Sequence, residues 1–217
     1  MCLIIANPEC KSVPAEHISR AFSTNHDGFG VMWYSEEERC LKSMRGMFPL
    51  ESIKHIFAGL EKRQVPYVAH FRFATHGTKN QDNCHPFMVG DYLGGVGMVH
   101  NGTLTGSEWR DSKRSDTAIL VDKIRGHIAS GDFSPFDLFE KQAPHVLSRY
   151  GSSIGSDKLV FMSGLGHINI VNEQNGDWLD GIWYSNTYSI GSSSFWNWED
   201  SEDDWERYTQ WMSRGTK

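Results

Sequence analysis

Apolar residues recur along this chain with two periods, one typical of helices and one typical of strands. In 15–24 and 51–62 they return every three to four positions, as on one face of a helix. Ser115 and Gly131 are a suitable N-cap and C-terminal stop for a further helix between them, and 135–150 adds another helical stretch. Short apolar or alternating runs next to turn residues predict strands, in 2–6, 26–35, 67–75, 94–102, 157–173 and 178–190.

This order of strands and helices predicts an α/β or α+β sandwich of sheets and helices, rather than a helical bundle or an all-β barrel. The composition changes at Phe195, where the chain becomes acidic and rich in tryptophan (FWNWEDSEDDWERYTQWMSRGTK). We therefore expect one domain over 1–194 and an appended C-terminal segment over 195–217. Because tryptophan often anchors interfaces, the segment either docks a partner or packs on its own domain.

The overall composition excludes several classes of protein. Hydrophobic residues make up 39% of the 217 residues and charged residues 22%, as in ordinary globular proteins. No apolar run approaches the roughly 20 residues that span a bilayer, and the N-terminus lacks the features of a secretory signal. We therefore expect a cytoplasmic protein that does not contact a membrane. The net charge of −6 argues against direct binding of nucleic acid.

Histidine and cysteine gather in the middle of the chain, which raises the question of a metal site. The candidate ligands are His70, His76, Cys84, His85 and His100. None of them has the CxxC, HxxxH or HExxH spacing that places ligands on one face. We expect no metal, and the absence of any CxxC pair also argues against a disulfide framework.

Cys2 stands where the removal of Met1 would leave a thiol and a free α-amine on one residue. The α-amine has a pKa near ~7.7–8.0, so it can serve as the base for its own thiol, directly or through one water. The alternative is that Cys2 is a small apolar residue that opens a buried strand.

Four other residues, in three segments, have polar groups suited to catalysis or binding. Arg72 lies in an otherwise apolar strand, and its planar guanidinium suits a carboxylate, although a structural ion pair would explain it as well. Asn101 and Gly102 form a common turn, or they hold a developing oxyanion. Asp116 is either a plain first-turn carboxylate of a helix or an acceptor for a substrate ammonium.

Taken together, these segments resemble the class II glutamine amidotransferases, whose glutaminase domains belong to the N-terminal nucleophile hydrolases. The resemblance spans about 2–190 and is carried by MCLIIA, HDGFGVMWY, RFATHGTKNQDNCHPF, VHNGTL and SDTAIL, in that order. It implies an α+β fold with four αββα layers, in which two antiparallel sheets lie between helices. The later FMSG and GIWYSNTY further resemble short stand-alone members encoded by bacteriophages. Ala118 departs from the family, many of whose members have glutamate there.

The resemblance also implies a role for each matching residue. Cys2 would attack the side-chain amide of L-glutamine and form a thioester, with its own amine as base and with Asn101 and Gly102 as oxyanion donors. Arg72 would bind the α-carboxylate of glutamine and Asp116 its α-ammonium. The pocket wall would consist of Thr75, His76 and Gly77. No cofactor is implied.

The resemblance implies glutamate and ammonia as products, and larger relatives carry a further domain that uses the ammonia. We expect no such acceptor domain in 195–217, and expect the ammonia to pass to a separate acceptor enzyme, for example in nucleotide or nucleobase modification. Two alternatives remain: a γ-glutamyl amide hydrolase that acts on a larger substrate, and a non-catalytic module that binds glutamine or a host factor and keeps Met1.

Overall fold

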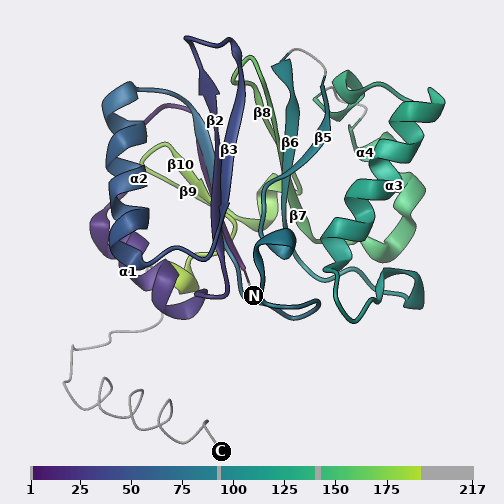
Figure 1. Cartoon of the computed structure of the whole chain (residues 1–217), viewed down its shortest axis with the longest axis horizontal. Coiled ribbons are helices and arrows are strands. Elements are labelled where there is room, and N and C mark those ends of the chain that lie inside the picture. Colours follow the sequence, from purple (N-terminus) through teal and green to yellow (C-terminus); the bar gives the residue numbers. More distant parts are fainter. Residues whose placement is uncertain (1, 92–93, 140–142, 192–217) are drawn as a thin grey trace, which may run out of the picture.

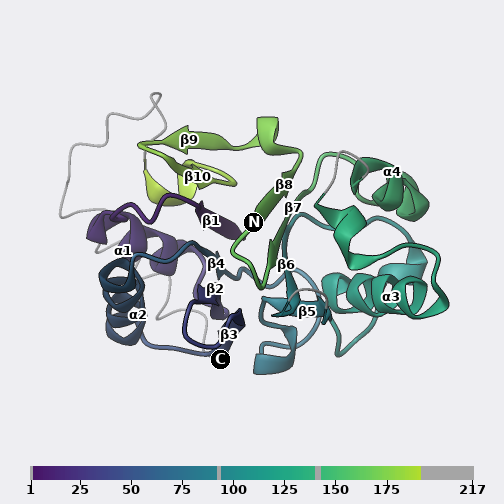
Figure 2. The same cartoon turned by 90° about the horizontal axis from the view of Figure 1, so that it is seen from above.

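Two antiparallel sheets lie face to face, and helices cover the outer side of each (Figures 1 and 2). The computed structural model describes residues 2–91, 94–139 and 143–191. The first sheet has the strand order β3 (Cys40–Gly46), β2 (Phe29–Ser35), β4 (Tyr67–Phe71), β1 (Leu3–Asn7), β10 (Ile182–Tyr184) and β9 (Asp177–Leu179). The second has the order β5 (Phe87–Gly90), β6 (Val96–Asn101), β7 (Lys158–Ser163) and β8 (Ile168–Val171).

The helices form the two outer layers. Helices α1 (Ala15–Thr24) and α2 (Leu50–Arg63) cover the first sheet, and α3 (Asp116–Ser130) and α4 (Ala143–Leu147) cover the second (Figure 1). Short 3₁₀ turns occupy Gln81–Asn83, Ser107–Trp109, Pro135–Leu138, Ser148–Ser153, Glu173–Asn175 and Tyr188–Ile190. This arrangement confirms the predicted α+β fold with four αββα layers. No helix of the described ranges is long and apolar enough to cross a membrane.

Strand β1 shows why its sequence is continuously apolar. Leu3 and Ile5 pack with the helices on the outer side of the first sheet, whereas Ile4 and Ala6 pack against the second sheet. Because successive side chains of a strand point to opposite faces, a strand in a middle layer of the sandwich buries every residue. The N-terminal strand is therefore anchored on both faces.

The strand register brings several chain segments to one edge of the first sheet. Leu3 at the start of β1 pairs with Phe71 at the end of β4, and Phe29 at the start of β2 pairs with both Phe71 and Gly46. The residue before Leu3 is Cys2. The loop after β4 and the turn before β2 therefore lie beside the N-terminus.

Some predicted elements differ from the structure. Strand β4 ends at Phe71, so Arg72 and Thr75 belong to the following loop rather than to the strand. The helix expected over 135–150 is wrong in extent, because the described part consists of a 3₁₀ turn, the five-residue helix α4 and a second 3₁₀ turn. Strands β3 and β5 were not predicted. The tryptophan-rich segment 195–217 lies outside the described residues.

Candidate active site

Cys2 is half-buried at the edge of the first sheet, where Phe73 and Asn186 form hydrogen bonds with it. The Phe73 amide donates to Cys2 Sγ at 3.3 Å, and Sγ lies 3.4 Å from the Phe73 carbonyl oxygen. The Asn186 side chain donates to the Cys2 carbonyl oxygen at 2.9 Å. Burial raises the pKa of the Cys2 thiol, and the hydrogen bond with the Phe73 backbone opposes this. The thiol therefore needs a base before it can act as a nucleophile at neutral pH.

A small cavity of about 20 Å³ adjoins Cys2. Its walls come from the loop after β4, the turn after β6 and the N-terminus of α3. The residues that line it are Cys2, Arg72, Phe73, Ala74, Thr75, His76, Asn83, His85, His100, Gly102, Ser115, Asp116 and Thr117. Six of the eight residues predicted from the sequence are in this set, and Gly77 and Asn101 are not.

Arg72 is buried and connects the cavity to the loop that follows it. Its guanidinium donates to the carbonyl oxygens of His76 and Thr78, each at 3.1 Å. A guanidinium has five N–H donors, so three remain without an acceptor among the described residues. Arg72 thus shapes the loop and still has donors available for a ligand.

The loop after β4 is fastened to the N-terminus of α3. Asn83 donates to the carbonyl oxygens of Thr78 and Lys113 and accepts from the Ser115 amide at 2.8 Å. Gly77 has φ +73°, and a Cβ at this position would come within 2.7 Å of the Arg114–Ser115 backbone. Gly77 therefore contributes a close backbone contact rather than a cavity wall.

Asp116 is buried at the start of α3, where Ser115 caps the helix through the Ala118 amide as predicted. One carboxylate oxygen of Asp116 accepts from the Leu104 amide at 2.9 Å, and the other accepts from the Thr117 amide at 2.7 Å. These bonds fix the position of the carboxylate at the N-terminus of the helix. The site therefore has one fixed anion, Asp116, and one fixed cation, Arg72.

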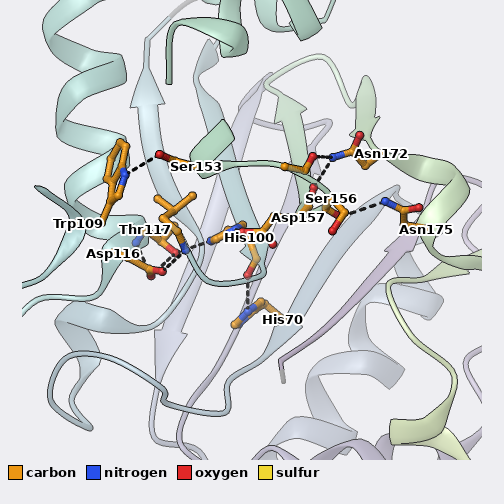
Figure 3. A network of polar contacts seen from close by, with 12 residues as sticks. His70, His100, Trp109, Asp116, Thr117, Ser153, Ser156, Asp157, Asn172 and Asn175 are labelled. Carbon is orange, nitrogen blue, oxygen red and sulfur yellow. Dashed lines mark hydrogen bonds and ion pairs between the residues drawn. The ribbon is translucent and has the colours of Figure 1, made fainter. Parts of the chain in front are cut away.

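A chain of polar contacts leads from Asp116 to a residue that the sequence did not indicate (Figure 3). Thr117 Oγ1 lies 2.9 Å from His100 Nδ1, and His100 Nε2 lies 3.0 Å from the Asp157 carboxylate. Because a carboxylate only accepts, His100 carries a proton on Nε2. Asp157 also packs against Gly102, where an added Cβ would lie 1.9 Å from Asp157 Cγ. Glycine is therefore required at 102 for this close approach.

Asn101 lies beside this cavity without lining it. It is buried at the end of β6, and its Nδ2 lies 2.7 Å from Ser185 Oγ, which follows β10 in the other sheet. Its Oδ1 has no hydrogen-bond partner among the described residues. The Gly102 amide donates no hydrogen bond within the part of the chain that the structure describes.

The histidines that suggested a metal site form a buried pair instead. His70 Nε2 lies 2.8 Å from His85 Nδ1 and 3.1 Å from the His100 carbonyl oxygen. Burial lowers the pKa of His70 to about 3 and lowers the pKa of His85 well below its ordinary value, so both rings are neutral near pH 7. Among the described residues, no group of three or more His, Cys, Asp or Glu side chains is placed to hold a metal ion.

Comparison with known sequences agrees with the resemblance noted above. The family model described as "Glutamine amidotransferases class-II" matches residues 16–118. Glutamine--fructose-6-phosphate aminotransferase (isomerizing) of Aliivibrio fischeri is 24% identical over 170 residues, which are 71% of this chain and 26% of that protein. The enzyme of the same name from Pseudomonas aeruginosa is 26% identical over 141 residues, 60% of this chain and 22% of that protein. The chain thus spans about a quarter of these relatives.

Solved structures share the fold. Glutamine phosphoribosylpyrophosphate amidotransferase from B. subtilis, complexed with ADP and GMP, matches with a TM-score of 0.52 and 18% identity, over 88% of this chain and 43% of that one. A structure described as the allosteric regulatory enzyme of purine biosynthesis matches with a TM-score of 0.51 and 20% identity, over 87% of this chain and 42% of that one.

Proposed function

Because this chain belongs to the class II glutamine amidotransferases, an enzyme family of N-terminal nucleophile hydrolases, we propose that it hydrolyses the side-chain amide of L-glutamine at Cys2. One observation carries the proposal: Cys2, Arg72, Gly102 and Asp116 come from four separate segments and line one cavity. They provide a nucleophile, a cation, a backbone donor and an anion. A zwitterionic amino acid with a reactive amide needs each of these groups.

The reaction begins after Met1 is removed. The α-amine of Cys2 takes the thiol proton, and Sγ attacks the amide carbon of glutamine. The Gly102 amide and the Asn101 side chain stabilise the oxyanion of the tetrahedral intermediate. The amine then returns the proton to the leaving nitrogen, so that ammonia departs and a glutamyl thioester remains. Water hydrolyses the thioester to glutamate and regenerates the thiol.

Arg72 and Asp116 fix the orientation of the substrate. Arg72 has donors left for the α-carboxylate, and Asp116 accepts from the α-ammonium. His76 Nδ1 is buried and has no hydrogen-bond partner in the described part of the chain, so it is a further polar atom with which a substrate can form a hydrogen bond. Thr75 also lines the cavity, and Gly77 allows the loop to lie close to the Arg114–Ser115 backbone before α3.

The ammonia serves an acceptor that is bound outside the described residues, either on another domain or on a separate enzyme. The acceptors named for the relatives are fructose 6-phosphate and phosphoribosylpyrophosphate, both phosphorylated sugars. We propose an acceptor enzyme of nucleotide or nucleobase modification. The acidic, tryptophan-rich segment 195–217 is the candidate for contact with it.

The proposal is tested by glutamate release from L-glutamine, with the wild type compared with Cys2→Ala. Cys40→Ala is the matched control, because Cys40 is a partly buried thiol of the same sheet, away from the cavity. We expect activity in the wild type and in Cys40→Ala, and none in Cys2→Ala. Intact mass should show the loss of Met1. Retained Met1, activity in Cys2→Ala, or a preference for γ-glutamyl conjugates over glutamine would each contradict the proposal.

A further inference from the structure

Asn101 and Ser185 form a buried polar bridge between the two sheets. Asn101 ends β6 of the second sheet, and Ser185 directly follows β10 of the first. Ser185 is fully buried and Asn101 nearly so. Ser185 Oγ accepts from the Ile4 amide at 2.8 Å and lies 2.7 Å from Asn101 Nδ2. The Ser185 amide donates to the Ile4 carbonyl oxygen at 3.0 Å.

In this bridge, one donor and one acceptor are left without a hydrogen-bond partner among the described residues. With Nδ2 facing Ser185, the serine oxygen accepts two hydrogen bonds and its own proton has no acceptor among the described residues. Asn101 Oδ1 is also buried and unpaired. Buried polar groups are nearly always paired, so two unused groups at one contact need an explanation.

Rotation of the Asn101 amide by half a turn leaves one unpaired group at this contact instead of two. The oxygen and nitrogen of an amide are nearly equal in size, so the rotation has no steric cost and hydrogen bonding decides between the two orientations. Ser185 then accepts from Ile4 and donates to Asn101 Oδ1. Asn101 Nδ2 takes the place of the unpaired oxygen and becomes a buried donor without a partner.

We propose that Ser185 is a positioning residue that holds the Asn101 amide with Nδ2 free to bind the oxyanion of the reaction. The inference rests on the function proposed above. It adds a residue that no sequence motif marks, and it explains why Asn101 is effective as a donor. An asparagine without an anchor for its oxygen would present either end of its amide to the oxyanion.

The surroundings of Ser185 place this donor near the nucleophile. Ile4, which bonds Ser185 through its amide and its carbonyl oxygen, is two residues from Cys2. Asn186, the residue after Ser185, donates to the Cys2 carbonyl oxygen. Gly102, the residue after Asn101, lines the cavity beside Cys2. One short segment after β10 therefore holds both the nucleophile strand and the asparagine.

A double-mutant cycle on glutamate release tests the inference. Asn101→Ala should lower kcat by about 10²–10³-fold, and Ser185→Ala by about tenfold or more, with KM within about threefold of the wild type. Because Ser185 acts through Asn101, the double variant should be no slower than Asn101→Ala alone. Multiplied losses in the double variant, or an unchanged kcat in Ser185→Ala, would overturn the proposal.

Two controls separate positioning from a general loss of stability. Ser189→Ala removes a buried hydroxyl of the same segment that bonds Asn25 instead of Asn101, and it should keep the wild-type kcat. If Ser185→Ala does not fold, Ser185→Cys fills the site with a slightly larger sulfur atom that is a weaker donor. Ser185→Cys should lower kcat, and combining it with Asn101→Ala should lower kcat no further than Asn101→Ala alone. A wild-type kcat in a folded Ser185→Cys would count against the positioning role of Ser185.

NMR on ¹⁵N-labelled protein tests the orientation without catalysis. The Asn101 side-chain amide protons are assigned from their loss in Asn101→Ala. If Oδ1 accepts from Ser185, neither Nδ2 proton is bonded to Ser185. Neither proton should then show a downfield shift in the wild type that is lost in Ser185→Ala. A downfield proton that moves upfield in Ser185→Ala would overturn the inference. A wild type that releases no glutamate contradicts the proposed function instead, and the NMR result still decides the orientation.

Discussion

Gly102→Ala perturbs the proposed oxyanion site through a contact that the structure defines. The added Cβ would lie 1.9 Å from Asp157 Cγ and 2.2 Å from both carboxylate oxygens. Real Cβ atoms keep at least 3.0 Å from such neighbours, so the Cβ would lie about 1.1 Å too close to Cγ. Asp157 has little freedom to retreat, because His100 Nε2 holds its carboxylate at 3.0 Å.

The size of the effect follows from which group gives way. If Asp157 moves, His100 loses its acceptor, and the overpacking and the unpaired N–H together cost about 2 kcal/mol or more. In a domain of this size, about 2 kcal/mol lowers the Tm by about 4–8 °C. If the backbone at Gly102 moves instead, its amide shifts by about 1 Å from the oxyanion, which is expected to lower kcat by about 10²-fold.

The assay combines thermal unfolding with the kinetics of glutamate release. Gly59→Ala is the matched control, because Gly59 lies inside α2 with nothing within 4 Å of the added Cβ. It should raise stability by about 0.5–1 kcal/mol and leave kcat unchanged. In Gly102→Ala with Asp157→Ala, space is restored and part of the kcat should return. A Gly102→Ala protein with wild-type kcat and wild-type Tm would refute the reasoning.

Three further outcomes are expected. Since burial lowers the pKa of His70 to about 3 and that of His85 well below normal, the unfolded chain binds more protons than the native one below about pH 6.5. Stability is therefore full above that pH and falls by about 1.4 kcal/mol per pH unit and per histidine on acidification, in urea titrations at pH 7, 6 and 5; a flat profile would contradict this. Asp157→Asn, which still accepts from His100, should cost less than 1 kcal/mol, whereas Asp157→Ala should cost about 1–3 kcal/mol in the same titrations, and equal losses would count against the His100 contact. Arg72→Lys loses the planar fork and should lower kcat/KM for glutamine by about 10–100-fold, mainly through KM, so a change in kcat alone would argue against carboxylate binding.

Elements with local signals were predictable from the sequence. Helix α3 begins after Ser115 and ends before Gly131 because a serine oxygen caps free amides and glycine adopts the left-handed φ of 79° found at the end of the helix. Strand β1 was recognisable because both of its faces are buried. These features depend on residues within a few positions of one another, so one stretch of sequence contains all the information.

Elements defined by distant partners were harder to predict. The alternation of Tyr67–Thr75 continues past Phe71, but the regular ladder stops there, because Arg72 exchanges backbone bonds with Asp27 and Gly28 in the turn before β2. Strand β3 lies at the edge of its sheet, where half-exposed polar residues weaken the apolar pattern.

The residues of the site that lie outside the motifs were also difficult to predict, because their partners are distant in the sequence. Asn101 and Gly102 look like a turn in the sequence, and the resemblance to a family is what suggests oxyanion donors. What fixes each of them in space comes from the last third of the chain. Asp157 lies so close to Gly102 that only glycine fits there, and Ser185 of the other sheet contacts the Asn101 amide. An aspartate before a strand and a serine after one have no local signal, because the pairing of β6 with β7 brings Asp157 to Gly102 and the packing of the two sheets brings Ser185 to Asn101. A search for oxyanion donors in this fold should therefore look at what contacts the Asn-Gly turn from the opposite sheet and from the strand beside it.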